Sequence, residues 1–463
     1  MSNIHFGTDG WRAIIGEDFT EANLELVADA AARAFSEKYG SGTIYVGHDC
    51  RQDAHHYSEI AAKVIASHGF DVALTDKYCP TPTLCWTVGH DESAIGGVML
   101  TSSHNPAEYL GVKLRMKDGG ASPKEFTDRV EELMEEGVSE KKNEGSFKQV
   151  DIMTPYLDSL KTLVDVDSIK SANLHVVLDP LYGAARNYLS NLLKDMGVCV
   201  TEINNAEDPT FDGLHPEPVP PWVDRGLAKV KEIEADALFI NDGDADRIAA
   251  GDKYGNFVNP HRIIMLVTKH LYNKGGRGRV VSTVTASALL GRLCDKLGLE
   301  LTSTQVGFKW IYEQMQHGDV MVGGEESGGI GIPTHVMERD GLLMALLLTE
   351  MMAQSGKDLG QLVSELLDEL GTMEFERIGL SVSDDQMSNF RNSIIPAFTP
   401  TDASGFSVKD IDRRDGIKLY LENDAWVMMR PSGTEPLIRI YAEAETKEDV
   451  STLLEWAKDI ICN

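Results

Sequence analysis

The stretch TIYVGHDCRQDAHHYSEIAAKVIASHGFDVALTD, residues 43–76, indicates the fold of this chain. A β-branched run is followed by a turn, an amphipathic helical segment that ends near a glycine, and a second apolar run. The same order recurs in LHVVLDPLYGAARNYLSNLLKDMGVCVTEIN at 174–204 and in GRVVSTVTASALLGRLCDKLGLELTSTQVG at 278–307. Each segment, of roughly 30 residues, is typical of a β-α-β unit with a right-handed crossover. Three such units predict three similar α/β domains with parallel or mixed sheets.

From residue 373 onward the pattern changes to short strand-like runs followed by one helical segment, EDVSTLLEWAKDII. This order suits a smaller antiparallel α+β domain. We therefore expect an α/β fold with three similar mixed-sheet domains plus a C-terminal antiparallel α+β domain. The expected boundaries are 1–145, 146–252, 253–368 and 369–463.

The composition indicates which binding partners and which cellular compartment fit this chain. The formal charge of −30 disfavours nucleic acid and anionic membranes, although local Arg and Lys residues can still bind a small anion. The six scattered cysteines contain no C-x-x-C pair, which favours a reducing cytoplasm. No signal peptide is apparent at the N-terminus. The apolar stretch 341–353 contains Glu350 and is shorter than a membrane span of about 20 residues, so it predicts a buried helix.

The first candidate site is TSSHNP, 101–106, where the apolar run 98–100 stops abruptly. Ser, Asn and Pro are ordinary turn residues, so a simple turn is one interpretation. The other is a hydroxyl presented at a strand end, where α/β proteins keep their chemistry.

The second candidate site is DGDADR, 242–247, which follows an apolar run. Carboxylates at this spacing on a tight loop can converge on one hard cation and supply the oxygen ligands that Mg²⁺ prefers. An EF-hand does not fit, because Arg247 stands where the loop glycine belongs and Lys253 where the bidentate glutamate belongs. The alternative is a solvated acidic turn, but it would leave three carboxylates close together with nothing to neutralise their repulsion. We therefore favour a metal site. Three protein oxygens also leave room around the metal for a phosphate oxygen. The three aspartates are Asp242, Asp244 and Asp246.

The third candidate site is the glycine-rich loop GGEESGG, 323–329. Glycines let the backbone approach a ligand closely, and a carboxylate with a hydroxyl can bind sugar hydroxyls. A flexible polar loop explains this motif alone equally well.

The fourth candidate site is RPSGTEP, 430–436, which places a guanidinium, two hydroxyls and free backbone amides in five residues. This combination suits a phosphate group. Arg439 could add a second cation. The alternative is a Pro/Gly turn with an exposed arginine. Together the four sites have the parts needed for phosphoryl transfer on a phosphorylated polyol.

In this order along the chain, FGTDGWR, TSSHNP, DGDADR, GGEESGG and RPSGTEP resemble the motifs of the α-D-phosphohexomutase superfamily. The resemblance covers essentially the whole chain and implies four domains around a central cleft. It implies that Ser103 carries a phosphoryl group and that Ser103, Asp242, Asp244 and Asp246 hold Mg²⁺. It further implies that a hexose 1,6-bisphosphate forms, turns round without leaving and returns its other phosphate to Ser103.

The resemblance also implies roles for the remaining motif residues. The basic residues near the reacting phosphate would be Arg12, Lys113 and Arg247, and Lys113 and His104 are candidates for proton transfer or charge stabilisation. Sugar hydroxyls would contact Glu325 and Ser327. The substrate phosphate would bind Arg430, Ser432, Gly433, Thr434 and Arg439.

The loop GEESGG is the feature of the sequence that bears on which sugar the enzyme prefers. Relatives that accept mannose or glucosamine often carry GEMSGH or GEQSGH, whereas this chain has GEESGG, with Gly329 in place of the histidine. GEESGG followed by ERDG (338–341) looks more like the glucose-preferring or archaeal-type branch. Phosphoglucomutase activity is therefore expected, with phosphomannomutase and phosphoglucosamine mutase as alternatives. The missing histidine leaves the general acid or base open.

Two rival functions use the same residues. A Mg²⁺-dependent phosphatase does not explain separate substrate clamps at Glu325 and Arg430. A non-catalytic sugar-phosphate-binding protein would tolerate loss of Ser103 or of an aspartate, whereas every motif is chemically intact. We expect a cytoplasmic enzyme, monomeric or homodimeric, that acts on a small hexose phosphate and binds neither nucleic acid nor membrane.

Overall fold

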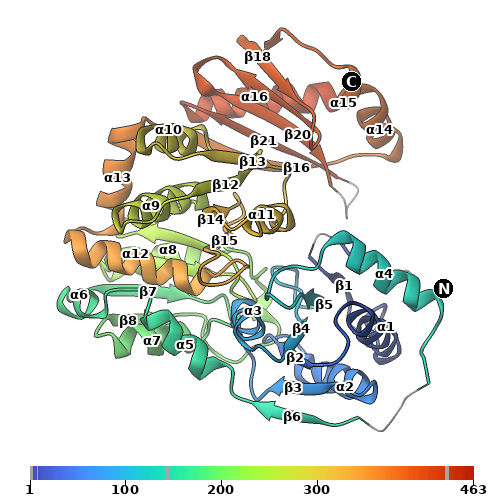
Figure 1. Ribbon diagram of the computed structural model, residues 1–463. Coiled ribbons are helices and arrows are strands. Elements are labelled where there is room, and N and C mark those ends of the chain that lie inside the picture. Colours follow the sequence, from blue (N-terminus) through green and yellow to red (C-terminus); the bar gives the residue numbers. More distant parts are fainter. Residues whose placement is uncertain (1–3, 8, 141–144, 433–436, 463) are drawn as a thin grey trace.

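The computed structural model describes residues 4–7, 9–140, 145–432 and 437–462. Four sheets follow one another along the chain, and each forms the centre of one domain, here numbered I to IV (Figure 1). Within the described ranges, no helix is both long enough and apolar enough to cross a membrane.

Domain I is a six-stranded mixed sheet with helices packed against it. Its strands are β1 (Trp11–Ile14), β2 (Thr43–His48), β3 (Asp71–Thr75), β4 (Ala94–Leu100), β5 (Tyr109–Arg115) and β6 (Phe147–Val150), and its helices are α1 (Glu21–Tyr39), α2 (Ala54–Ser67), α3 (Thr81–His90) and α4 (Lys124–Glu135). The strand order is β1-β5-β4-β2-β3-β6. Every residue of β4 is buried, so the loop that follows this strand begins inside the molecule.

Domain II has a five-stranded sheet in the order β11-β10-β9-β7-β8. Its strands are β7 (His175–Asp179), β8 (Cys199–Glu202), β9 (Ala237–Asn241), β10 (Ile248–Asp252) and β11 (Phe257–Val258), with the helices α5 (Met153–Lys161), α6 (Val166–Ser171), α7 (Tyr188–Asp195), η1 (Phe211–Gly213) and α8 (Asp224–Glu232). β10 runs antiparallel to β9, so the chain reverses in the loop that carries DGDADR. Most of the segment 204–221 is irregular, as expected for a long loop.

Domain III has a four-stranded sheet in the order β13-β12-β14-β15. Its strands are β12 (Arg279–Thr283), β13 (Leu301–Thr304), β14 (Val320–Gly324) and β15 (Ile330–Gly331), with the helices α9 (Pro260–Asn273), α10 (Ala288–Leu297), α11 (Phe308–Met315), α12 (Gly341–Ser355) and α13 (Leu359–Leu370). The three predicted β-α-β units are confirmed, because β2 and β3, β7 and β8, and β12 and β13 pair in parallel.

Domain IV is an antiparallel sheet in the order β16-β21-β20-β19-β18-β17. Its strands are β16 (Glu374–Ser381), β17 (Asp402–Ala403), β18 (Phe406–Asp412), β19 (Ile417–Leu421), β20 (Trp426–Pro431) and β21 (Leu437–Ala444). Its helices are α14 (Asp384–Asn389), η2 (Phe390–Ile394), α15 (Ile395–Ala397), η3 (Glu422–Asp424) and α16 (Lys447–Cys462). This confirms the predicted C-terminal antiparallel α+β domain, which lies beside domain III in Figure 1.

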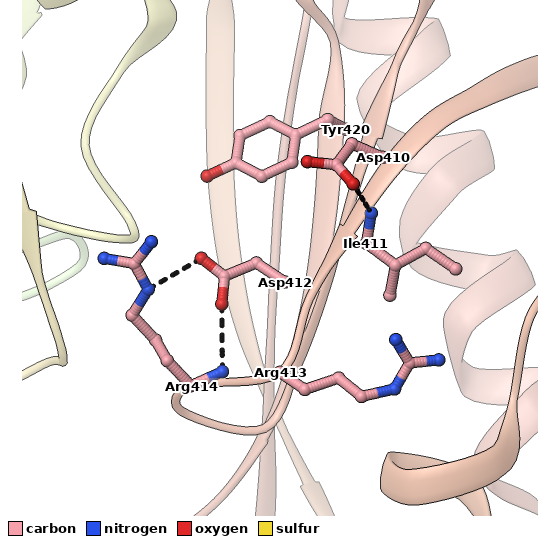
Figure 2. A pocket seen from close by; sticks show the side chains of 6 residues that line it. All are labelled: Asp410, Ile411, Asp412, Arg413, Arg414 and Tyr420. Carbon is pink, nitrogen blue, oxygen red and sulfur yellow. Dashed lines mark hydrogen bonds and ion pairs between the residues drawn. The ribbon is translucent and has the colours of Figure 1, made fainter.

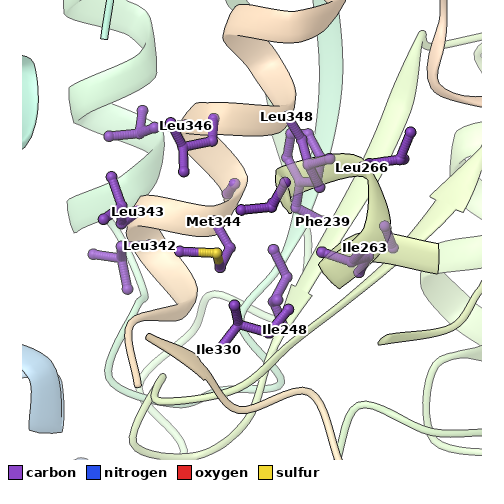
Figure 3. Close-up of a cluster of buried hydrophobic side chains, with 14 of the residues drawn as sticks. Phe239, Ile248, Ile263, Leu266, Ile330, Leu342, Leu343, Met344, Leu346 and Leu348 are labelled. Atoms are coloured by element: carbon purple, nitrogen blue, oxygen red, sulfur yellow. The ribbon is translucent and has the colours of Figure 1, made fainter. Parts of the chain in front are cut away.

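The predicted buried helix is α12, whose residues are buried from Gly341 to Met352. The carboxylate of Asp340 caps this helix by accepting a hydrogen bond from the amide of Leu343 at 2.9 Å. Leucines and a methionine of α12 lie among apolar side chains of domains II and III (Figure 3). Domains II and III therefore share one core, while domain IV and most of domain I have clusters of their own.

Candidate active site

Ser103 is held in an unusual backbone conformation just after β4. Its φ of 49° is left-handed, which a residue with a side chain adopts only when its surroundings enforce it. The amide of Ser103 donates to Oγ1 of Thr101 at 2.9 Å. The buried guanidinium of Arg51 donates to the carbonyl oxygens of Ser103 and Asn105, each at 2.7 Å. The loop is therefore a constrained structure, which agrees better with a presented hydroxyl than with a simple turn.

The hydroxyl of Ser103 faces the aspartate loop of domain II. Its Oγ donates to Oδ2 of Asp242 at 2.8 Å and lies 3.4 Å from Nδ1 of His104. The side chains of Ser103 and Asp242 are both buried. The fold thus brings the first two candidate sites together across the boundary between domains I and II.

The three aspartates form a compact acidic cluster between β9 and β10. One carboxylate oxygen of each lies within 4.8 Å of those of the other two, and all three residues are fully buried. Oδ1 of Asp244 and Oδ1 of Asp246 have no hydrogen-bond partner. Buried carboxylate oxygens without donors are costly unless a cation binds them. The cluster of Asp242, Asp244 and Asp246 therefore fits a hard divalent cation.

Lys113 of β5 lies against this cluster. Its Nζ is 2.8 Å from Oδ2 of Asp244 and 3.0 Å from Oδ2 of Asp246. Burial acts to lower the pKa of Lys113, but the surrounding carboxylates outweigh it and raise the pKa above its ordinary value. Lys113 is therefore charged, and it pairs with the Oδ2 atoms, whereas the two Oδ1 atoms accept no hydrogen bond.

Asp9 and Arg339 also belong to this cluster, although neither is among the predicted site residues. Arg339 donates to Oδ2 of Asp9 at 2.6 Å and lies 2.7 Å from Oδ2 of Asp246. Asp9 in turn lies 2.8 Å from Nζ of Lys113. Both residues stand inside quoted motifs, FGTDGWR and ERDG. A charged residue inside a motif was the only sequence signal for each, and their partners lie far away along the chain.

The other predicted residues of the first two sites lie at the same place. Arg12 donates to Oδ1 of Asn105 at 2.6 Å, beside Ser103. Nε of Arg247 lies 3.9 and 3.8 Å from oxygens of two of the aspartates. Burial lowers the pKa of His104 well below its ordinary value, and the charges of neighbouring arginines and Lys113 lower it further. The imidazole of His104 is therefore neutral at pH 7.

Glu325 and Ser327 lie on the loop between β14 and β15. Oγ of Ser327 donates to Oε1 of Glu325 at 2.9 Å, and Oε2 of Glu325 is buried without a hydrogen-bond partner. Burial raises the pKa of Glu325 to about 7, and the charge of Arg339 offsets only part of this effect. A buried carboxylate oxygen that lacks a donor suits a ligand hydroxyl, as the sugar-binding interpretation expects.

Gly329 packs closely against the side chain of Arg339. A Cβ at Gly329 would lie 2.2 Å from Cδ of Arg339. The side chain of Arg339 thus occupies the space that any side chain at position 329 would need. In this chain the guanidinium of Arg339, from ERDG, therefore stands beside the loop.

The fourth candidate site lies on the sheet of domain IV. Arg430 of β20 and Arg439 of β21 stand directly opposite each other in the register, so both project from one face of the sheet. Nε of Arg430 pairs with Oδ2 of Asp415 at 2.8 Å. Ser432 is buried. The remaining two predicted phosphate-binding residues, Gly433 and Thr434, lie outside the described residues.

A pocket of about 430 Å³ in domain IV is separate from these residues (Figure 2). It is lined by Asp410, Ile411, Asp412, Arg413, Arg414 and Tyr420. Figure 2 shows Arg414 paired with Asp412. Nε of Arg414 lies 2.8 Å from Oδ2 of Asp412. None of the predicted site residues lines this pocket.

Comparison with known proteins identifies the class. The family descriptions "Phosphoglucomutase/phosphomannomutase, alpha/beta/alpha domain" I, II and III match residues 3–141, 154–255 and 259–370, and the C-terminal domain of the same family matches 401–457. The fold is thus that of the phosphohexomutases, which are isomerases. The chain belongs to the phosphoglucomutase/phosphomannomutase family, as the sequence resemblance predicts.

Individual relatives carry different substrate names. A phosphoglucomutase/phosphomannomutase from Thermococcus kodakarensis is 33% identical over 455 residues, which cover 97% of this chain and 96% of that protein. A protein from Methanopyrus kandleri named "probable phosphoglucosamine mutase" is 31% identical over 462 residues, covering 99% and 97%. A solved structure from Thermus thermophilus, provisionally named a phosphomannomutase, has a TM-score of 0.89 and 36% identity, with both chains fully covered.

Proposed function

We propose that this enzyme interconverts the 1-phosphate and 6-phosphate of a hexose, with glucose as the preferred sugar, through a phosphoryl group on Ser103. The observation that carries the proposal is the buried Oγ of Ser103, 2.8 Å from Asp242 in a cluster of three carboxylates. A hydroxyl at a metal-binding cluster can accept and return a phosphoryl group.

The proposed reaction is two phosphoryl transfers in opposite directions. The bond between phosphorus and Oγ of Ser103 breaks as a bond forms to a free hydroxyl of the bound hexose monophosphate, giving a hexose 1,6-bisphosphate. The hydroxyl loses its proton, for which His104 is a candidate acceptor because its imidazole is neutral. The bisphosphate then turns round, and its other phosphoryl group returns to Ser103.

The charged residues around Ser103 would stabilise this transfer. Mg²⁺ held by the three aspartates would neutralise charge on the transferring phosphoryl group. Lys113 holds the aspartates in place with its own charge. Arg12 and Arg247 stand beside the loops that carry Ser103 and Asp242, where they would attract a dianionic phosphate.

The two ends of the sugar would be held by separate domains. Glu325, whose free Oε2 needs a donor, would accept hydrogen bonds from sugar hydroxyls together with Ser327. The non-reacting phosphate would bind the domain IV residues, which are Arg430, Ser432, Gly433, Thr434 and Arg439. Turning the bisphosphate exchanges which phosphate lies at each end, so one clamp serves both half-reactions.

The choice of glucose rests on the loop GEESGG, in which Gly329 stands where relatives that accept mannose or glucosamine often carry a histidine. The names of the relatives support mannose and glucosamine as alternatives, because both sugars appear among proteins that match nearly the whole chain. The rival functions from other classes are a phosphatase, which would release phosphate, and a sugar-phosphate-binding protein, which would neither isomerise the sugar phosphate nor release phosphate.

The test is the intact mass of the purified protein after incubation with Mg²⁺ and glucose 1,6-bisphosphate. We expect a gain of one phosphate that is lost in Ser103→Ala and kept in Ser102→Ala, a neighbouring buried serine. No gain in the folded wild type would contradict the phosphoserine mechanism. Glucose, mannose and glucosamine 1-phosphates are then compared as substrates, with phosphate release measured in parallel to detect a phosphatase.

A further inference from the structure

Domain IV reaches domain II through a single ion pair near the candidate active site, among the residues that the structure describes. A guanidinium nitrogen of Arg377, on β16, lies 3.3 Å from Oε1 of Glu217, on the loop 204–221. The two side chains are only 30% and 19% exposed, so water screens this pair less than an open surface pair. Other contacts of domain IV run to domain III, including a hydrogen bond from Nζ of Lys418 to the carbonyl oxygen of Val284 at 2.6 Å.

On the domain II side, the residue next to Glu217 is hydrogen-bonded to the aspartate loop. The carbonyl oxygen of the preceding residue, Pro216, accepts a hydrogen bond from the amide of Gly243 at 3.1 Å. Gly243 separates two of the clustered aspartates, and it packs so closely on Ser103 that an added Cβ would lie 2.3 Å from the carbonyl oxygen of Ser103. The loop that carries Glu217 therefore lies directly against the aspartate loop, which in turn packs on Ser103.

The same loop also supports the backbone of Ser103 from a second point. The ring of Phe211 lies 5.0 Å from the guanidinium carbon of Arg51, in a cation–π contact. Arg51 is the residue that donates to the carbonyl oxygen of Ser103. A shift of loop 204–221 would thus move Arg51 and, through it, the backbone of Ser103.

On the domain IV side, Arg377 shares a sheet face with the predicted phosphate-binding arginines. Arg377 of β16 stands opposite Tyr441 of β21, and Tyr441 is two residues from Arg439 on the same strand. Side chains two residues apart on a strand project from the same face. The hydroxyl of Tyr441 is buried without a hydrogen-bond partner. The pair with Glu217 therefore attaches to the ligand-facing side of domain IV.

We infer that the Glu217–Arg377 pair is a latch that holds domain IV closed over the bound sugar while the bisphosphate turns round. This inference rests on the proposed function. Domain III already contacts β16, through the ring of Phe375 on His261 at 4.5 Å between ring centroids. The pair of Glu217 and Arg377 adds a second link, from the same strand to the loop beside the aspartates. One shielded ion pair is strong enough to favour closure and weak enough to open during each turnover.

The test compares Glu217→Gln, Arg377→Gln and the double variant with the wild type. Labelled hexose 1,6-bisphosphate released into solution per turnover is measured, together with kcat and KM. We expect about a three- to tenfold rise in release for each single variant and no further rise in the double variant. The matched control is Arg225→Gln, which breaks an exposed pair with Asp212 of the same loop at 2.7 Å and should leave release unchanged.

A second measurement tests the latch without turnover. Amide hydrogen exchange in β16 and in loop 204–221 should rise in Glu217→Gln and stay unchanged in Arg225→Gln. Unchanged exchange and unchanged release in Glu217→Gln, while the wild type turns over hexose phosphate, would overturn the latch alone. A wild type that forms no phosphoserine would overturn the proposed function, and faster exchange in Glu217→Gln would then leave only a domain contact without a mutase role.

Discussion

Gly243 is a residue whose lack of a side chain brings two loops of the site together. It stands between Asp242 and Asp244, where the sequence shows only a small spacer in an acidic run. An added Cβ would lie 2.3 Å from the carbonyl oxygen of Ser103 and 3.3 Å from Cγ of Pro216. The first distance is far inside van der Waals contact, and the neighbouring atom belongs to the backbone. The distance between the aspartate loop and Ser103 is therefore set by a glycine.

We predict that Gly243→Ala reduces kcat/KM by about a hundredfold or more, because a displacement of roughly 1 Å at a catalytic group has that effect. The matched control is Gly291→Ala on α10, where an added Cβ meets nothing within 4 Å. This control should keep full activity and gain slightly in stability. Steady-state kinetics and thermal unfolding of both variants make the comparison, and an active Gly243→Ala would refute the tight approach.

Glu325 has a carboxyl group whose pKa burial raises to about 7. Above pH 7 its carboxylate is ionised and accepts sugar hydroxyls fully, so kcat/KM should rise with pH through about 7. Glu325→Gln should lower kcat/KM by roughly tenfold to a hundredfold, as expected for a lost hydrogen bond to a charged group. It should also flatten the rise. The phosphate group of the substrate also titrates, near about pH 6. The pH dependence of kcat/KM is therefore measured in both the wild type and Glu325→Gln. An equal rise of kcat/KM with pH in both proteins would show that a group other than Glu325 causes the rise.

Among the elements, α12 combines an apolar surface with one buried charge. Glu350 is fully buried within this helix. Its carboxylate accepts hydrogen bonds from Nζ of Lys274 at 2.7 Å, and from the amide of Asp165 at 2.7 Å; it lies 2.6 Å from Nε2 of His270. These partners belong to α9, to the residue just after it and to the residue before α6. Glu350 thus joins three helices at a point where an isolated carboxylate would be unstable.

We predict that Glu350→Gln destabilises the protein at pH 7 and changes its acid sensitivity. Burial acts to raise the pKa of Glu350, but hydrogen bonds from His270, Lys274 and the amide of Asp165 outweigh it and lower the pKa to about 2. A folded pKa below the unfolded value gives stability that is present above about pH 5 and lost as the pH falls toward about 2. For this shift the contribution is about 3 kcal/mol.

Thermal unfolding at pH 7 and pH 3 measures this effect. The midpoint of Glu350→Gln should lie several degrees below that of the wild type at pH 7, and the gap should narrow at pH 3. The control is Glu365→Gln, which removes an exposed partner of Lys357 and should change little. A gap that stays constant between the two pH values would show that ionisation of Glu350 does not contribute.

For the whole molecule, the acidic cluster links domains I and II. Asp242 accepts a hydrogen bond from the hydroxyl of Ser103, and Asp244 accepts one from Oγ1 of Thr81 at 2.5 Å. Lys113 adds a third connection from domain I. A cation bound by these aspartates would therefore stabilise the contact between domains I and II in addition to the loop itself.

We predict that Mg²⁺ raises the thermal midpoint of the protein. A ligand at about a hundred times its Kd adds about 2.7 kcal/mol of stability when it binds only the folded state. A rise of a few degrees is expected, reversed by a chelator and lost in Asp244→Asn. Asp424→Asn, on the edge of domain IV, is the control and should retain the rise. An equal rise in Asp244→Asn would place the cation elsewhere.

Much of the site could be predicted because each motif is local. Ser103, the three aspartates, Glu325 and Arg430 all stand in short segments at or just after strand-like runs. The sequence does not predict Arg339, Asp9 or Arg51, because the chemistry of each depends on a partner from a distant segment. Arg51 illustrates this: it lies on the turn after β2, and it acts by holding the carbonyl oxygen of Ser103, 52 residues away.

The amino-acid sequence by itself determined the number and kind of domains, since hydrophobic periodicity and turn residues are local properties of the chain. It also determined which chemical groups each loop carries. Only the tertiary structure decided that Lys113 is a charged partner of the aspartates, that Arg339 fills the space beside Gly329, and that Glu217 meets Arg377. These contacts depend on how separate sheets pack, and distances between groups far apart in the chain are set by that packing and not by any local pattern.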